Sequence, residues 1–152
     1  MKELYLLWKF LYMNKYKIIV QYDGSSFSGF QSQKNLNTIQ DKIEHSLSFL
    51  NQNNLIRVVG ASRTDAGVHA LGQVVHFNFD TELSLNAIKR AINARLPHQI
   101  RIIDIKAVNT EFHSRFDAIK KQYLYQCSLT ENPLLSNCLL YTSDAADEVD
   151  RG

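Results

Sequence analysis

The chain has 152 residues, of which 45% are hydrophobic and 21% charged, with six glycines and two prolines. This composition excludes a disordered, collagenous or low-complexity protein and fits one ordinary domain. The formal net charge is +2 and rises to +5 when residues 138–152 are left out, which is a weak indication of nucleic-acid binding.

Membrane insertion and a disulfide framework are both disfavoured by the sequence. No apolar run reaches the roughly 18 to 20 residues that a membrane span needs. The two cysteines, Cys127 and Cys138, have neither the number of a disulfide framework nor the spacing of a metal site. We therefore expect a soluble protein of the reducing cytoplasm, with no membrane partner.

Both ends of the chain differ in character from the middle. Residues 1–12 are predicted to be an upstream extension, because a strand pattern begins directly after Met13. Residues 131–152 are predicted to be a truncated end. Within them, 138–152 is predicted to be a non-native tail, since its first part resembles the in-frame translation of a sequencing-library adapter. One domain is expected over 13–130.

Alternating and helical hydrophobic periods predict a regular order of strands and helices between these ends. Thr38 and Ser84 are expected to cap the two helices, and Pro97 to stop the second. In chain order, the predicted elements are a strand at 16–22, a helix at about 39–51, strands at 56–59 and 73–79, a helix starting after residue 84, and strands at 100–105 and 121–129.

This order is β-α-β-β-α-β followed by a further strand. It predicts an α+β, ferredoxin-like (split βαβ) fold, in which an antiparallel sheet carries two helices on one face. The other face of the sheet is then open to a ligand.

The segment 60–70, with the sequence GASRTDAGVHA, holds the clearest candidate for chemistry. Asp65 follows a predicted strand, with Arg63 two residues before it and Gly67 two residues after it. A glycine there allows positive φ and the close approach of a substrate, and a nearby arginine keeps the carboxylate ionised. Such a carboxylate can act as a nucleophile or as an electrostatic stabiliser. Taken alone, the same residues would also fit an ordinary turn with a surface ion pair.

Several motifs in chain order resemble the TruA family of tRNA pseudouridine synthases, from residue 15 to about 130. The most specific motif is RTDAGVHA at 63–70, which is followed by GQVVHF at 72–77. The sequence departs from many members at Ser62, where they carry glycine, and at Phe30, where they carry tryptophan. The other matching residues are Tyr22, Asp23, Gly24, Phe27, Gly29, Gln31 and Gln33, and FHSRF at 112–116.

The resemblance implies an isomerase that converts uridine to pseudouridine at positions 38, 39 and 40 of the tRNA anticodon arm. It implies no cofactor, a homodimer, and an active site between two ferredoxin-like halves, of which this sequence matches the first. We therefore expect the full-length protein to be this enzyme and the fragment to be inactive alone.

The resemblance also implies roles for three residues. Asp65 falls on the catalytic aspartate, which attacks or assists cleavage at the ribose C1′ of the target uridine. Arg63 falls on the basic residue implicated in flipping the target base and filling its place. Tyr123 falls on the tyrosine that stacks on the target base. A flipped base in a pocket with an aromatic platform fits this chemistry, because a stacked helix hides the C1′ atom.

Another function stays open from the sequence alone. A ferredoxin-like sheet with aromatic residues is also the architecture of non-catalytic, single-stranded RNA readers. The strand aromatics of this chain do not follow the motif that those readers use. His69, His76 and His113 are too irregularly spaced to indicate a metal site, and we expect them to be loop or surface residues.

Overall fold

The structure is a computed structural model that describes residues 14–130, 133 and 140–141. They fall into two units, the first ending at Ala118 and the second beginning at Ile119, and each is described by itself. The first unit therefore ends inside the range 13–130 that was predicted as one domain. The predicted upstream extension and most of the predicted tail lie outside the described residues.

The first unit contains a four-stranded sheet with two α-helices, in the predicted order. The strands are arranged β2-β3-β1-β4, and all neighbours are antiparallel. This arrangement confirms the predicted ferredoxin-like α+β fold. In chain order the elements are β1 (Lys15–Tyr22), α2 (Ile39–Ser48), the 3-10 helix η1 (Phe49–Asn51), β2 (Val58–Gly60), β3 (Ala70–Asn78), α3 (Leu85–Asn93) and β4 (Ile100–Val108).

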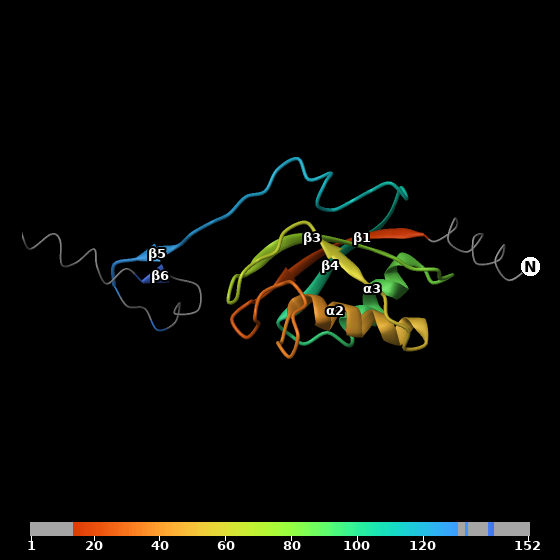
Figure 1. Ribbon diagram of the computed structural model, residues 1–152, viewed down its shortest axis with the longest axis horizontal. Coiled ribbons are helices and arrows are strands. Elements are labelled where there is room, and N and C mark those ends of the chain that lie inside the picture. The colour runs from red at the N-terminus through yellow and green to blue at the C-terminus, as the bar shows by residue number, and fades with distance from the viewer. Residues whose placement is uncertain (1–13, 131–132, 134–139, 142–152) are drawn as a thin grey trace, which may run out of the picture. The chain divides into compact units, whose positions relative to one another are not determined.

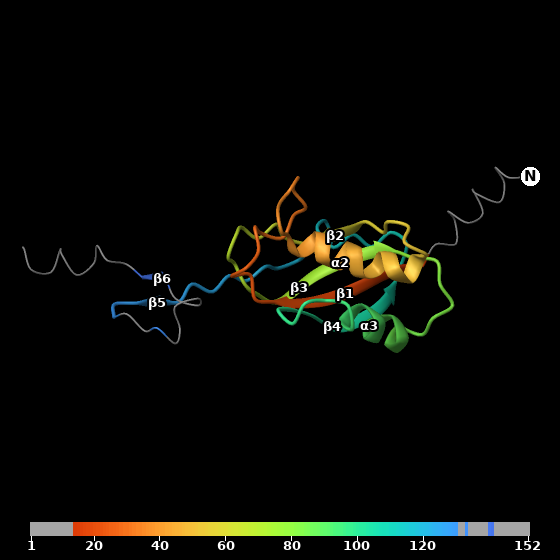
Figure 2. The ribbon, with the colours of Figure 1, turned by 90° about the horizontal axis from the view of Figure 1, so that it is seen from below.

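The core lies between the helices and one face of the sheet. Figure 1 shows α2 and α3 below the sheet, and Figure 2 shows α2 toward β2 and α3 toward β4. Alternate strand residues and one stripe of each helix meet there, as the two hydrophobic periods predict. The buried residues include Tyr16, Ile18, Val20 and Tyr22 of β1, Val75 and Phe77 of β3, Ile39, Ile43 and Leu47 of α2, and Ile88 and Ile92 of α3.

The helix boundaries follow the predicted caps. The Thr38 hydroxyl accepts a hydrogen bond from Asp41 N (3.3 Å), and the Ser84 hydroxyl accepts one from Ala87 N (3.3 Å). Each bond satisfies a backbone donor that has no partner within the first turn of the helix. The first helix covers the predicted range 39–51, with its last turn tightened into η1, and the chain then turns at Gln52 with a φ of +52°.

The face of the sheet opposite the helices is partly covered. Residues 109–117 cross it, above the sheet in Figure 1. The Lys15 ammonium donates a hydrogen bond to Phe112 O (2.9 Å), and the Ser114 hydroxyl donates one to Val59 O (2.7 Å). The open face that was predicted for a ligand is therefore narrower than the fold class alone suggests.

The predicted strand at 121–129 is wrong over most of its length. Only Cys127–Ser128 (β5) is a strand, and it pairs in parallel with Leu140–Tyr141 (β6). Residues 119–126 have no regular secondary structure and are exposed. Strand propensity alone does not form a strand, because the backbone groups need a neighbouring strand to pair with. Within the described residues, no helix is long and apolar enough to cross a membrane.

Candidate active site

The predicted catalytic residues lie on the loop of residues 61–69, which joins β2 to β3 and is called the Asp65 loop below. Arg63 and Asp65 are both exposed. Val68 N donates a hydrogen bond to Asp65 O (3.2 Å), and Gly67 between them has a φ of +79°. The backbone therefore uses the left-handed conformation that the sequence predicted for this glycine.

The residues that flank the aspartate are anchored to the end of β1 and the segment after it. The Tyr22 hydroxyl lies 2.8 Å from Thr64 Oγ1, and Phe30 N donates a hydrogen bond to Thr64 O (3.0 Å). On the other side of the aspartate, Gly67 N donates one to Phe27 O (3.2 Å). The backbone of the loop is thus fixed on both sides while the carboxylate faces solvent.

Two glycines let the segment after β1 approach the loop closely. A Cβ atom on Gly29 would lie 2.8 Å from Thr64 O, and the φ of Gly29 is +92°. A Cβ atom on Gly24 would lie 2.0 Å from Val68 O. Both distances are shorter than non-bonded atoms allow. Two motifs that are about 40 residues apart in the sequence therefore form one packed unit.

Asp23 and His69 join the same two segments. The ring Nδ1 atom of His69 lies 3.1 Å from Asp23 Oδ1 and 3.2 Å from Gly24 N. Hydrogen bonds from Ser25, with a smaller contribution from His69, hold the pKa of Asp23 below its usual value. A neutral Nδ1 accepts from Gly24 N, whereas a protonated Nδ1 donates to Asp23, so one contact exists only at the expense of the other.

Within the described part of the chain, no ion pair joins Arg63 to Asp65, so the arginine does not form the surface ion pair of the alternative interpretation. Among the described residues, the ion pairs are Arg57 with Glu44, His69 with Asp23 and Lys106 with Asp104. Both side chains project from a loop into solvent, where an ion pair gains little over hydration. The guanidinium of Arg63 is thus exposed and not paired with Asp65.

Tyr123, the third predicted site residue, belongs to the second unit. Its side chain is 61% exposed, on a segment without regular secondary structure. The first unit brings Arg63 and Asp65 together on one loop, and Tyr123 is not part of that unit.

His76 and Ser114 form a buried pair that the sequence analysis did not identify. The His76 ring is 7% exposed, and its Nδ1 atom accepts a hydrogen bond from Ser114 N (3.1 Å). Burial, with a further contribution from His113, lowers the pKa of His76 to about 4. The prediction of a loop or surface residue is wrong for His76, because residues 109–117 cover it. The alternation of β3 could have predicted that His76 lies on the face of the sheet opposite the core. It could not have predicted that residues 109–117 bury the ring there.

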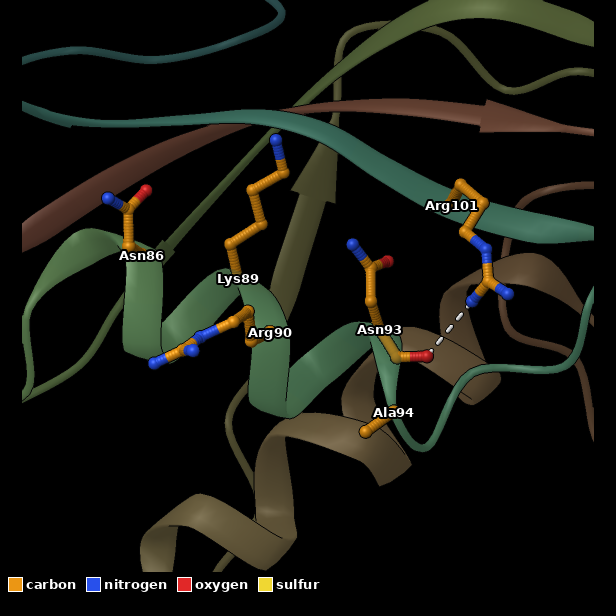
Figure 3. A pocket seen from close by; sticks show the side chains of 6 residues that line it. All are labelled: Asn86, Lys89, Arg90, Asn93, Ala94 and Arg101. Atoms are coloured by element: carbon orange, nitrogen blue, oxygen red, sulfur yellow. Dashed lines mark hydrogen bonds between the residues drawn. The ribbon is translucent and has the colours of Figure 1, made fainter.

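A pocket of about 730 Å³ lies between α3 and β4. Figure 3 shows the side chains that line it. The Asn93 carboxamide accepts from Ile102 N (2.8 Å) and donates to Ile102 O (3.0 Å). Arg101 donates to Asn93 O (3.0 Å), as the dashed line in Figure 3 marks, and Lys89 donates to Ile103 O. These contacts cap the outer edge of β4 and the end of α3. They engage Lys89, Asn93 and Arg101 of the pocket lining, to which the Asp65 loop contributes no residue.

Comparisons with known proteins match the part of the sequence that contains the Asp65 loop. A family model described as tRNA pseudouridine synthase matches residues 18–117. The tRNA pseudouridine synthase A of Latilactobacillus sakei is 40% identical over 115 residues, which are 76% of this chain and 46% of the relative. The tRNA pseudouridine synthase A of Ehrlichia ruminantium is 43% identical over 122 residues, which are 79% of this chain and 49% of the relative.

The chain belongs to the tRNA pseudouridine synthase family. The matched region includes most of β1, the whole of β2, β3 and β4, both α-helices and the Asp65 loop. The chain spans about half the length of the curated relatives it matches.

Proposed function

We propose that the full-length protein isomerises uridine to pseudouridine at positions 38, 39 and 40 of the tRNA anticodon arm, and that this chain supplies the loop with the reacting carboxylate. The observation that carries the proposal is the exposure of Asp65 on a backbone anchored on both sides. A carboxylate that must meet a ribose needs solvent access and a fixed position, and the Asp65 loop provides both.

The proposed reaction needs no group beyond the protein and the RNA. The bond from N1 of uracil to C1′ breaks, the uracil rotates in place, and C5 bonds to C1′, which releases any bond that the carboxylate formed there. The hydrogen of C5 leaves as a proton, and N1 takes up a proton. Asp65 attacks or assists at C1′, and its charge suits the positive character that develops there as the base departs.

Arg63 and Tyr123 act on the RNA around the reacting bond in this proposal. The target base must leave its stack before C1′ is accessible. Arg63 is two residues from the aspartate, exposed, and not in an ion pair with it, so its guanidinium can fill the space the base vacates. Tyr123 stacks on the extruded base.

The proposed enzyme works in the cytoplasm. It forms a homodimer and needs no cofactor. The chain alone, which spans about half of its relatives, is proposed to be inactive. In this proposal, the part of the relatives that this chain does not match corresponds to the rest of the tRNA-binding surface.

The deciding experiment measures tritium release from tRNA labelled at C5 of uridine. The full-length protein should release tritium, and Asp65→Asn should reduce release by several orders of magnitude while tRNA binding stays within about threefold, because a reacting carboxylate contributes more to the transition state than to binding. Asp80→Asn is the matched control, since Asp80 is an exposed loop aspartate outside the site.

The outcomes separate the two candidate functions. Release by the Asp65→Asn variant at the wild-type rate would refute the assigned role of Asp65. Tight tRNA binding without any release by the full-length protein would favour a non-catalytic RNA-binding module instead.

A further inference from the structure

The side chain of Gln73 binds the backbone of the Asp65 loop at the residue where the loop leaves the sheet. The pairing of β2 with β3 places Val58 opposite Phe77 and Gly60 opposite Val75. Ala61 N still donates to Val74 O (2.8 Å), which extends the ladder by one residue beyond β2. Continued at the same spacing, the ladder would place Ser62 opposite Gln73.

At that position the side chain of Gln73 replaces its backbone. Ser62 N donates a hydrogen bond to Gln73 Oε1 (3.3 Å), and Gln73 Nε2 donates one to Ser62 O (2.7 Å). A carboxamide carries the same donor and acceptor as a peptide group, so it completes one more rung of the ladder. Gln73 is 7% exposed, and its own backbone pairs with Val20 of β1.

The geometric consequence is a change of direction in the chain. A rung made by a side chain keeps the two backbones farther apart than a rung made by two peptide groups. Ser62 therefore diverges from β3 while both of its backbone polar groups stay bonded. The divergence occurs three residues before Asp65, and the next anchor is Thr64 O, which accepts from Phe30 N.

We propose that Gln73 is a positioning residue for Asp65: its carboxamide sets the direction in which residues 62–65 leave the sheet, and so places the carboxylate. The inference rests on the proposed function, because it assigns Gln73 a role in that reaction. A positioning role differs from a purely stabilising role in its effect on the rate. A shift of about 1 Å at the reacting group can lower the rate about 100-fold while the protein stays folded.

Gln40 provides a matched control within the same fold. Its carboxamide also joins two backbone groups, accepting from Ser32 N (3.0 Å) and donating to Val58 O (3.2 Å), and it donates a further bond to Glu44 Oε1 (2.9 Å). Val58 lies at the opposite end of β2 from the Asp65 loop. Loss of either carboxamide removes two hydrogen bonds to backbone groups, and Gln40 loses one to Glu44 as well, but only the Gln73 carboxamide bonds to the Asp65 loop.

The test uses three variants of the full-length enzyme: Gln73→Met, Gln73→Glu and Gln40→Met. Methionine keeps the length of the side chain and removes both hydrogen bonds. Glutamate keeps the acceptor for Ser62 N but places a second acceptor against Ser62 O. Single-turnover tritium release and tRNA affinity are measured well below each unfolding midpoint. Amide hydrogen exchange at Ser62 is measured in the 152-residue chain.

We expect Gln73→Met to lower the rate of the chemical step by about 10-fold to 100-fold and to change the tRNA Kd by less than about twofold. Gln73→Glu should also lower the rate of the chemical step. Exchange at Ser62 should accelerate in both Gln73 variants and not in Gln40→Met, which should keep the wild-type rate.

Three results would overturn the inference. One is a wild-type rate in both Gln73 variants, and another is a loss that appears only in Kd. The third is an equal rate loss in Gln40→Met, which would show that the rate falls because the fold is destabilised and not because Asp65 is displaced. A full-length protein that releases no tritium, or an Asp65→Asn variant that keeps its rate, would instead refute the proposed function on which the inference rests.

Discussion

The hydroxyl of Tyr22, the last residue of β1, lies 2.8 Å from the hydroxyl of Thr64, the residue before Asp65. Tyr22 is 2% exposed, so the contact lies at the boundary between the core and the Asp65 loop. It connects β1, one of the two central strands of the sheet, to the side chain of the residue beside Asp65.

Removing this hydroxyl should weaken both the fold and the proposed reaction. Tyr22→Phe should lower the free energy of unfolding by about 1 kcal/mol, the usual net value of such a hydrogen bond. Denaturant unfolding of Tyr22→Phe, Thr64→Val and the double variant gives the coupling energy of the pair. Strictly additive losses would contradict a direct interaction between the two hydroxyls.

The glycines near the Asp65 loop should tolerate alanine to different degrees. Gly29→Ala should cost about 2 to 3 kcal/mol, because it combines positive φ with a Cβ atom 2.8 Å from Thr64 O. Gly67→Ala should cost about 1 kcal/mol, since its φ is positive but no atom lies within 4 Å of the added Cβ.

Gly72 is the matched control for this series. Its added Cβ would meet only Ile19 Cγ2, at an ordinary 3.6 Å, and Gly72→Ala should cause no loss of stability. Thermal unfolding of the three variants should therefore rank Gly72→Ala above Gly67→Ala and Gly29→Ala lowest. Any other order would argue against the described loop conformation.

His76 should make the stability of the fold depend on pH. Its pKa is about 4 in the folded chain against 6.5 for an ordinary histidine, so the unfolded chain binds a proton first as the pH falls. The stabilising contribution is complete above about pH 6.5 and is lost as the pH falls toward 4. Between pH 7 and pH 5 the loss should be about 2 kcal/mol.

Urea unfolding at these two pH values tests the assignment. His76→Asn should be less stable at pH 7, and its stability should fall less between pH 7 and pH 5 than that of the wild type. His98→Asn is the control, because His98 is exposed, and it should keep the wild-type slope. An unchanged slope in His76→Asn would rule out His76 as the source of the pH dependence.

Arg63 should affect activity without affecting stability. Its side chain is exposed and forms no ion pair among the described residues, so Arg63→Ala should change the free energy of unfolding by no more than about 0.5 kcal/mol. Tritium release by the full-length variant should fall. Arg63→Lys should rescue it only in part, because an ammonium lacks the planar shape that fills the place of a base. Full activity of Arg63→Ala would exclude the proposed role.

The sequence predicted those elements whose signals are local. Ile39, Ile43 and Leu47 recur at helical spacing and became the buried stripe of α2. Alternation around Val75 and Phe77 likewise predicted the core face of β3. The prediction of a strand at 121–129 was wrong over most of its length, because a strand forms only where a partner strand is present and not from the propensity of the segment itself.

The candidate site divides in the same way. Arg63, Asp65 and Gly67 lie within five consecutive residues, so a local motif was enough to predict them as candidates. The carboxamide of Gln73 and the buried His76 are defined by contacts with residues 11 and 38 positions away. Such contacts follow from strand register and from the path of residues 109–117, which no local pattern encodes.

The side chains that cap β4 also limit how this protein can associate with others. A strand arriving at Ile102 would find its N–H and C=O groups already bonded to Asn93, and Ile103 O bonded to Lys89. Growth of the sheet by edge pairing there would have to displace a carboxamide and a charged amine together. This stretch of the border is thereby protected from the backbone templating that leads exposed edge strands into aggregates.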